Sequence, residues 1–330
     1  MAQLAVLNAG GWGTALAVSL SASGHSVRLW ARRNELALEL AALRENRAYL
    51  AGVTIPESVS ITSDLAAAVD GAHLVLAVPI SRFLPRFAEL LAQVIRPGTP
   101  VIHGTKGLDP ETLMRPSEIL SRALQNACPV GMLSGPTHAE EVGRGIPTAA
   151  VVAFNDASSA AFSQSILNSE RFRVYTNGDL VGVELCAALK NVYAIAAGVS
   201  DGLGYGDNAK SALLTRCIAE LYRLVSAMGG QPGTVAGLAG MGDLVATCTS
   251  RHSRNRGAGE RLGRGENLDV ILGSSGQAIE GVFAARSVRT LVDRFGVEMP
   301  IAMQVHAVLY LGRSPRDAIT ELMARTATQE

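Results

Sequence analysis

The N-terminal end of the chain reads Leu4-Ala5-Val6-Leu7-Asn8-Ala9-Gly10-Gly11-Trp12-Gly13-Thr14-Ala15-Leu16-Ala17. Apolar residues, a glycine-rich turn and an alanine-rich run predict a buried strand, a tight loop and a helix. This order is typical of the first βα unit of a dinucleotide-binding domain, where N–H groups at the helix N-terminus hold a pyrophosphate. The turn departs from the usual Gly-x-Gly-x-x-Gly pattern because Asn8 takes the first position, ahead of Gly10 and Gly13. Since Asn tolerates the left-handed backbone region, we expect the turn to be retained.

The second predicted strand, residues 26–30, ends in Ala31-Arg32-Arg33. In NAD-binding domains an acidic residue commonly follows this strand and holds the ribose 2′-hydroxyl. None is present, and the guanidinium groups of Arg32 and Arg33 suit a 2′-phosphate instead. The sequence therefore favours NADP over NAD, or at least indicates that NADP is accepted. The alternative is that the two arginines form a solvated helix start.

Further apolar runs alternate with helical segments up to about residue 178 and then give way to helices alone. This pattern predicts an α/β fold, with an N-terminal Rossmann-like, doubly wound, mostly parallel sheet and an all-α C-terminal domain. We expect a dinucleotide-binding domain over residues 1–178 and a helical substrate-binding domain over residues 179–330. Besides the first two, strands are expected at 73–79, 100–103, 131–134, 148–154 and 172–176.

Two loops follow predicted strands and so lie where ligands of such sheets bind, beyond the carboxyl ends of the strands. One is Gly104-Thr105-Lys106-Gly107, which carries a lysine. The other runs from Ser134 to Glu140, and Thr137 with Glu140 three residues later has the form of a helix capping box.

Composition excludes several classes of function. The chain has 330 residues and zero net charge, so no overall field attracts nucleic acid or an anionic membrane. Four cysteines without a C-x-x-C pair indicate buried, reduced thiols in a cytosolic protein, and the six histidines show no metal-binding spacing. The longest apolar stretch, 180–199, is interrupted by Glu184 and Lys190 and predicts a poor membrane span. No export signal is evident, and we expect a cytoplasmic protein without a metal site.

Lysine is rare: only three of the 29 basic residues are lysines, at positions 106, 190 and 210. Lys190 stands in an otherwise apolar helix, where burial lowers the pKa of an amine toward neutrality. It is therefore a candidate to protonate the alkoxide that forms when hydride reduces a ketone. The alternative is a snorkelling or ion-paired lysine, with Glu184 as its partner.

A second unusual stretch, residues 240–256, packs hydroxyls, an amide and arginines between glycines. Arginine supplies bidentate charge and neutral donors fill the remaining oxygens, so this composition predicts a phosphate clamp. Asp243 is placed to orient a lysine or accept a substrate hydroxyl. A solvated loop and an RNA-binding loop are the alternatives, and the lack of interleaved aromatic residues disfavours RNA.

Six motifs in the expected order, from the first strand to about residue 300, closely resemble those of the bacterial NAD(P)-dependent glycerol-3-phosphate dehydrogenases. They are Asn8-Ala9-Gly10-Gly11-Trp12-Gly13-Thr14-Ala15, His103-Gly104-Thr105-Lys106-Gly107, Leu133-Ser134-Gly135-Pro136-Thr137, Leu189-Lys190-Asn191-Val192, Gly240-Met241-Gly242-Asp243-Leu244 and Ser253-Arg254-Asn255-Arg256.

The resemblance implies that Lys190 is the general acid and base, that Lys106 touches both cofactor and substrate, and that Asp243 assists at the same site. The implied substrate-binding residues are Lys106, Gly135, Thr137, Lys190, Asn191, Asp243, Thr247, Ser253, Arg254 and Asn255. With the glycine turn, the implied cofactor-binding residues are Gly10, Gly11, Trp12, Gly13, Arg32, Arg33, Tyr49, Lys106, Ala139, Arg254 and Glu280.

The reaction implied by the resemblance interconverts dihydroxyacetone phosphate plus NAD(P)H with sn-glycerol 3-phosphate plus NAD(P)⁺, for phospholipid synthesis, in a homodimer. One alternative is another two-domain dehydrogenase, of hydroxy-acid or ketopantoate type, which would be expected to recognise a carboxylate. Another is an NADPH sensor without catalysis. The run Ser253-Arg254-Asn255 disfavours the first, and Lys190 together with that run disfavours the second.

Overall fold

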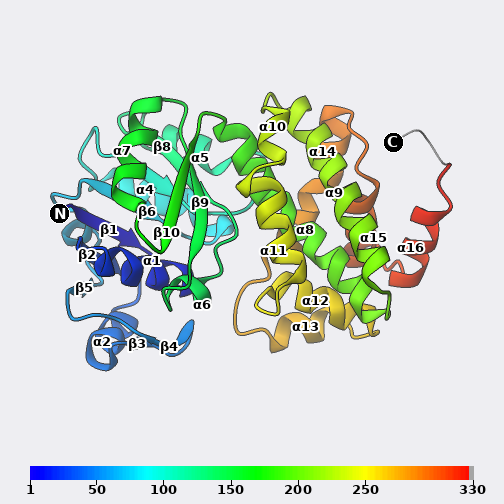
Figure 1. Cartoon of the computed structure of the whole chain (residues 1–330), viewed down its shortest axis with the longest axis horizontal. Coiled ribbons are helices and arrows are strands. Elements are labelled where there is room, and N and C mark those ends of the chain that lie inside the picture. Colours follow the sequence, from blue (N-terminus) through cyan, green and yellow to red (C-terminus); the bar gives the residue numbers. More distant parts are fainter. Residues whose placement is uncertain (327–330) are drawn as a thin grey trace. The chain divides into compact units, whose positions relative to one another are not determined.

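The computed structural model describes residues 1–326, and the chain forms two compact units (Figure 1). The first comprises Met1–Lys106 and Met114–Leu180, and the second comprises Gly107–Leu113 and the chain from Val181 onward.

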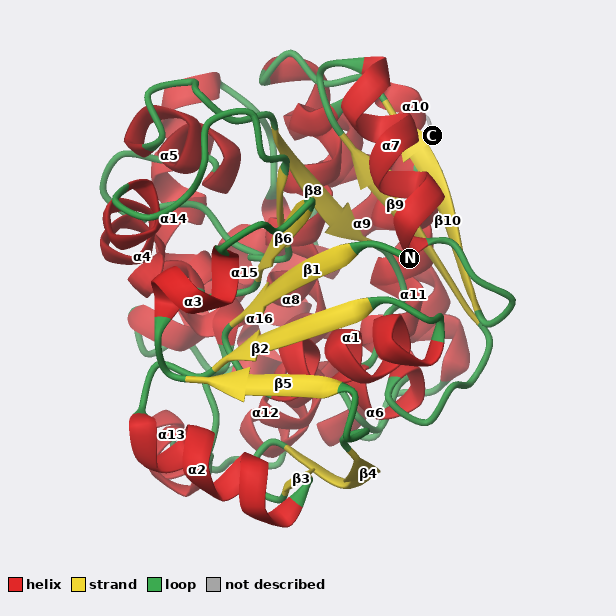
Figure 2. Cartoon of the chain, turned by 90° about the vertical axis from the view of Figure 1, so that its left-hand side faces the viewer, coloured by secondary structure: helices red, strands yellow, loops and turns green. Residues whose placement is uncertain are grey.

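The first unit is built on an eight-stranded sheet in the order β10-β9-β8-β7-β6-β1-β2-β5. Neighbouring strands are parallel except β8 and β9, so the predicted mostly parallel sheet is confirmed. The order reverses beside β1, which lies between β2 and β6, and Figure 2 shows β1, β2 and β5 side by side. Ligands of open α/β sheets bind at this reversal. The strands are β1 (Gln3–Leu7), β2 (Ser26–Trp30), β5 (Val59–Thr62), β6 (Leu74–Ala77), β7 (Val101–His103), β8 (Val130–Ser134), β9 (Thr148–Ala153) and β10 (Phe172–Asn177).

Helices cover both faces of this sheet. Alternate residues of β1 enter different cores, Leu4 and Val6 on one face and Ala5 and Leu7 on the other. Such two-sided burial explains why the strand is apolar throughout rather than alternating. A small antiparallel hairpin joins β3 (Glu45–Asn46) to β4 (Leu50–Thr54). The helices are α1 (Gly11–Ala22), α2 (Asn34–Leu43), α3 (Leu65–Val69), α4 (Leu84–Ala92), α5 (Pro116–Ala123), α6 (Ala139–Val142) and α7 (Ala157–Leu167), with a 3₁₀ turn, η1 (Ser81–Phe83), before α4.

The glycine turn between β1 and α1 has the geometry that its sequence predicts. Asn8 adopts a φ of +87°, so the residue that replaces glycine does occupy the left-handed region. A Cβ atom added at Gly13 would lie 2.0 Å from the carbonyl oxygen of Asn8, whereas one added at Gly10 would meet no atom within 4 Å. Gly13 is therefore required by packing between helix and turn, and Gly10 is not.

Gly13→Ala is expected to lower the free energy of unfolding by about 1–3 kcal/mol, because the added methyl group must displace backbone. Gly10→Ala, the matched control, is expected to cost less than about 1 kcal/mol, because Gly10 caps α1 with extended backbone in open space. Chemical denaturation of the cofactor-free protein measures both values. Equal losses would contradict this account of the turn.

The predicted capping box at Thr137 and Glu140 is wrong. Helix α6 begins one residue later than that box requires, and the residue that precedes its first turn is His138. The Thr137 hydroxyl instead donates a hydrogen bond to the carbonyl oxygen of Gly135, 3.1 Å away, and Gly135 has a φ of +130°. The hydroxyl closes a tight turn at the end of β8, and this competes with capping.

The second unit is helical throughout its described residues. Its longest helix, α8 (Leu180–Gly202), is long and apolar enough to span a bilayer by length and composition, but 89% of its most apolar window is buried inside the protein. A helix that is buried to this extent is a core helix of a folded unit. The other elements are α9 (Asp207–Ala227), α10 (Pro232–Val235), the π-helical turn η2 (Leu238–Gly242), α11 (Asp243–Thr249), α12 (Arg254–Gly263), α13 (Leu268–Ser274), α14 (Glu280–Phe295), α15 (Pro300–Tyr310) and α16 (Pro315–Met323).

A buried carboxylate ties α8 to two other helices. Glu220 on α9 accepts hydrogen bonds from the Tyr193 hydroxyl on α8 and from the backbone N–H groups of Ile301 and Ala302 at the start of α15. Burial raises the pKa of Glu220 to about 7, and the two backbone N–H groups oppose that shift. The contacts fix α8, which carries the candidate active site, within its unit.

Candidate active site

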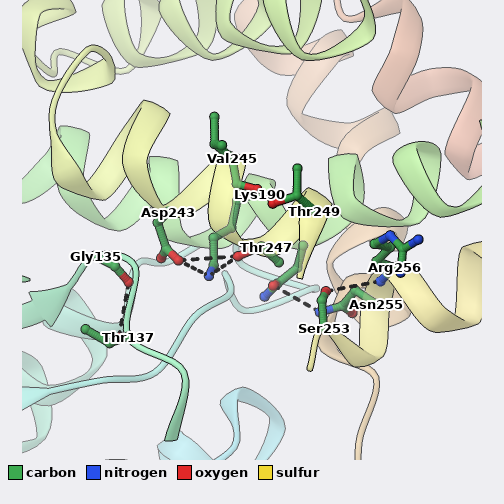
Figure 3. A network of polar contacts seen from close by, with 11 residues as sticks. Gly135, Thr137, Lys190, Asp243, Val245, Thr247, Thr249, Ser253, Asn255 and Arg256 are labelled. Atoms are coloured by element: carbon green, nitrogen blue, oxygen red, sulfur yellow. Dashed lines mark hydrogen bonds and ion pairs between the residues drawn. The ribbon is translucent and has the colours of Figure 1, made fainter. Parts of the chain in front are cut away.

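The side chain of Lys190 lies in a buried polar cluster of the second unit. Its Nζ donates to Asp243 Oδ1 at 2.5 Å and to Thr247 Oγ1 at 2.8 Å, as Figure 3 shows. The three side chains are all buried, with Lys190 only 5% exposed. Asp243 and Thr247 are four residues apart on α11 and therefore share one face of that helix. The ion-pair alternative for Lys190 is thus observed, with Asp243 as a partner.

The local backbone explains this arrangement. Asp243 is the first residue of α11, where the helix dipole favours a negative charge. The π-helical turn before it packs tightly, because a Cβ atom on Gly240 would lie 2.1 Å from the carbonyl oxygen of Val235. The carboxylate is held in place by backbone packing as well as by its bond to the amine.

Cys248, the neighbour of Thr247 on α11, does not offer a nucleophile at this site. Burial raises the pKa of its thiol to about 12, so the thiol is neutral at physiological pH. All four cysteines are buried and free, as predicted. Within residues 1–326 no group of three or more His, Cys, Asp or Glu side chains could hold a metal ion.

The predicted clamp is not the loop that its composition suggested. Most residues within 240–256 are helical. The turn η2 and helix α11 come first, a short turn follows at 250–253, and α12 begins directly after it. Ser253 caps α12, and its Oγ accepts a hydrogen bond from the backbone N–H of Arg256. The exposed Arg254 guanidinium donates to the carbonyl oxygen of Ala278. The first N–H groups of a helix have no partner within it, so this turn combines free donors with a cation, as anion binding requires.

The clamp and the lysine cluster are joined by two amides. Asn255 donates to the side-chain oxygen of Asn191 at 3.0 Å, and Asn191 directly follows Lys190 on α8. The oxygen of Asn255 accepts from the backbone N–H of Gly281, next to Glu280 at the start of α14. The structure therefore brings together every residue that the sequence predicted for the site in this unit: Lys190, Asn191, Asp243, Thr247, Ser253, Arg254, Asn255 and Glu280.

The predicted cofactor residues of the first unit gather around the start of α1. A Cβ atom on Gly11 would lie 2.6 Å from the carbonyl oxygen of Tyr49 and 3.8 Å from Cβ of Ala139. The indole of Trp12 lies against Gly104, two residues before Lys106. A Cβ atom on Gly10 would meet no atom within 4 Å, so the turn is open beside the first N–H groups of α1 and fits the pyrophosphate of a dinucleotide.

The two arginines after β2 are exposed, as a contact to a 2′-phosphate requires. The guanidinium of Arg32 lies 5.5 Å from the ring centre of Phe83, and that of Arg82 lies 4.6 Å from the same ring. No signal in the sequence indicated Arg82 and Phe83, because a single exposed Arg-Phe pair after a proline carries no motif. Gly135 and Thr137 directly follow β8 in the first unit, where the Thr137 hydroxyl donates to the carbonyl oxygen of Gly135 (Figure 3).

A Rossmann-type unit with a glycine turn at the sheet reversal, and a helical unit with a buried amine near a helix start that carries an exposed arginine, have the organisation of a two-domain dinucleotide-dependent dehydrogenase. Residues 3–160 match the family described as NAD-dependent glycerol-3-phosphate dehydrogenase N-terminus, and residues 179–320 match its C-terminus. The chain belongs to the family of NAD-dependent glycerol-3-phosphate dehydrogenases.

Individual relatives agree with this assignment. A protein of Moorella thermoacetica named glycerol-3-phosphate dehydrogenase [NAD(P)+] is 47% identical, over 99% of this chain and 97% of its own. The crystal structure of glycerol-3-phosphate dehydrogenase from Coxiella burnetii has a TM-score of 0.94 at 40% identity, covering 98% of this chain and 99% of that one. A ketopantoate reductase structure from Ralstonia eutropha shares the fold, with a TM-score of 0.62 at 17% identity, covering 96% and 99%.

Proposed function

We propose that the chain reduces dihydroxyacetone phosphate to sn-glycerol 3-phosphate with NADPH or NADH, and catalyses the reverse reaction. The observation that carries the proposal is the adjacency of the Lys190 cluster and the start of α12, through the bond between Asn191 and Asn255. A proton donor and an anion-binding helix terminus within one unit suit a small ketone that bears a phosphate. The names of the relatives, glycerol-3-phosphate dehydrogenases, support the same reaction.

In the proposed mechanism Lys190 donates a proton to the substrate oxygen as the carbonyl carbon is reduced. The bound dihydronicotinamide supplies the hydride. Asp243 and Thr247 orient the amine, and Lys106 stabilises charge on the oxygen. In the reverse direction Lys190 accepts the proton of the substrate hydroxyl.

The substrate's phosphate would be held by Arg254 and by the N-terminal turn of α12. Binding energy from this remote group orients the reacting carbon without taking part in the chemistry. The further residues proposed to line the substrate site are Gly135, Thr137, Asn191, Thr247, Ser253 and Asn255.

The cofactor is NAD or NADP, as in the family, and we propose that NADPH is preferred because of Arg32 and Arg33. The proposed contacts include Gly10, Gly11, Trp12, Gly13, Tyr49, Lys106, Ala139, Arg254 and Glu280. In this assignment residues 1–178 hold the cofactor and residues 179–330 the substrate.

Changing Arg32 and Arg33 together to alanine is expected to weaken NADPH binding by about 10- to 100-fold and NADH binding by less than about threefold, because only NADPH carries the 2′-phosphate. The dissociation constants can be measured by titration of nicotinamide fluorescence. Arg86→Ala, which removes an exposed arginine of α4, serves as the charge control. Equal weakening of both cofactors would show that the pair does not read the 2′-phosphate.

Mixing the purified protein with NADPH and dihydroxyacetone phosphate tests the reaction itself. Oxidation of NADPH with that ketone, but not with ketopantoate or 2-keto acids, supports the proposal. Oxidation with the keto acids alone would favour a hydroxy-acid or ketopantoate-type dehydrogenase, and binding of NADPH without turnover of any ketone would favour a sensor.

A role in phospholipid synthesis, a cytoplasmic location and a homodimeric assembly belong to the same proposal.

A further inference from the structure

A charged cluster joins α8 and α9 to the start of α12. Asp201, near the end of α8, bonds to Lys210 Nζ on α9 at 2.6 Å through one carboxylate oxygen. Its other oxygen accepts from Arg256 Nη2 at 2.6 Å and from Arg256 Nε at 2.7 Å. The three side chains are largely buried, with Asp201 11% exposed. Two charge-assisted hydrogen bonds to one carboxylate oxygen hold the Arg256 guanidinium at Asp201.

The backbones of α8 and α12 also touch directly. A Cβ atom on Gly198 would lie 1.9 Å from the carbonyl oxygen of Arg256, and one on Gly202 would lie 2.2 Å from that of Glu260. From the other side, Cβ atoms on Gly259 and Gly263 would lie 2.1 and 2.5 Å from carbonyl oxygens of α8. The two helices thus meet through paired Gly-x-x-x-Gly segments, and Asp201 lies within the segment on α8.

The four residues that open α12 are each bound to a different partner. Ser253 caps the helix, Arg254 contacts the chain before α14, and Asn255 contacts α8 and α14. Arg256 turns to Asp201 instead. Of the two arginines in this motif, only Arg254 is therefore directed to the proposed phosphate site.

We propose that Asp201 is a positioning residue for phosphate recognition. It fixes Arg256, and through it the first turn of α12, in the orientation in which Ser253, Arg254 and Asn255 receive the phosphate. Its single negative charge also offsets part of the positive charge of Lys210 and Arg256, as does Glu260, whose Oε2 lies 3.6 Å from Arg256 Nη1, and so reduces their competition with Arg254 for that phosphate. The inference rests on the proposed function of this turn.

The effect should fall on substrate binding and not on the chemical step. Asp201 is eleven residues beyond Lys190, which is about 16 Å along the helix. The bonds of Lys190 to Asp243 and Thr247 do not involve Asp201 or Arg256. Loss of the Asp201 charge therefore disturbs the start of α12 and leaves the amine cluster in place.

Steady-state kinetics of Asp201→Asn test the proposal. We expect the KM for dihydroxyacetone phosphate to rise about tenfold, while kcat stays within about twofold of wild type. Arg256→Met should raise the same KM, and adding Asp201→Asn to it should have little further effect, because the pair is already broken. Asp293→Asn, which breaks an exposed pair with Arg289 on α14, is the charge-matched control and should change nothing.

Asp201→Glu keeps the charge and is expected to keep the KM within about threefold of wild type, so it serves as the rescue variant if Asp201→Asn folds poorly. An unchanged KM in Asp201→Asn would overturn the proposal. So would a loss of kcat as large as the rise in KM, because a purely structural role lowers kcat too. A wild-type protein inactive with dihydroxyacetone phosphate would instead refute the proposed function, independently of the variants.

Discussion

Lys190→Ala is expected to lower kcat by about 10²- to 10⁴-fold while NADPH still binds with near wild-type affinity. The variant lacks the proton donor at the reduced oxygen, whereas the glycine turn and the arginines of the first unit are untouched. Pre-steady-state measurement of NADPH oxidation, with the cofactor dissociation constant measured separately, gives both values. Near-normal turnover would remove Lys190 from the mechanism.

Stability must be separated from catalysis in this variant. Removal of the amine leaves the Asp243 carboxylate buried without its cation, which typically costs about 3–5 kcal/mol. The double variant Lys190→Met with Asp243→Leu removes both charges and is expected to unfold at a higher temperature than Lys190→Ala. Its turnover should remain low. Recovery of activity along with stability would mean that the single variant was merely unfolded.

Arg254→Met is expected to lower kcat/KM for dihydroxyacetone phosphate by about 10²-fold, chiefly through KM. The exposed guanidinium at a helix N-terminus is the charged group proposed to grip the phosphate, and methionine keeps the length of the side chain without its charge. The matched control is Arg251→Met, which removes an exposed arginine three residues earlier, before α12 begins. A similar loss of kcat/KM in both variants would indicate a general effect of charge. An unchanged KM in Arg254→Met would exclude Arg254 from phosphate binding.

The fold could be predicted where local pattern and tertiary structure agree. The strand Ser26–Trp30 is found with the bounds expected, and the change from strands to helices at α8 is equally clear in the sequence. A short strand was expected after the loop that begins at Tyr49, but the bounds of β5 were not predicted, because four residues at the edge of a sheet carry too short a pattern. The β3–β4 hairpin is shorter still, since only two residues of β3 are paired.

The site was predicted as a set of residues but not as a geometry. The Ser-rich and Arg-rich run near Ser253 has the composition of a loop, yet its serine caps a helix, because the same hydroxyl that favours turns also satisfies a helix start. Asp243 lies 53 residues from Lys190, and no sequence pattern reports a contact over that distance. The spacing of Asp243 and Thr247, four residues apart in an apolar segment, is the one signal that could have suggested a shared partner.

The π-helical turn at Leu238–Gly242 has a consequence for how this site tolerates change in chain length. A π turn holds one more residue than an α turn, and successive residues of an α-helix are about 100° apart around its axis. Deleting a single glycine there would rotate the whole of α11 by about that angle and carry the Asp243 carboxylate away from the amine, although every side chain was retained. The direction in which Asp243 points toward Lys190 is thus determined by the number of residues that precede it.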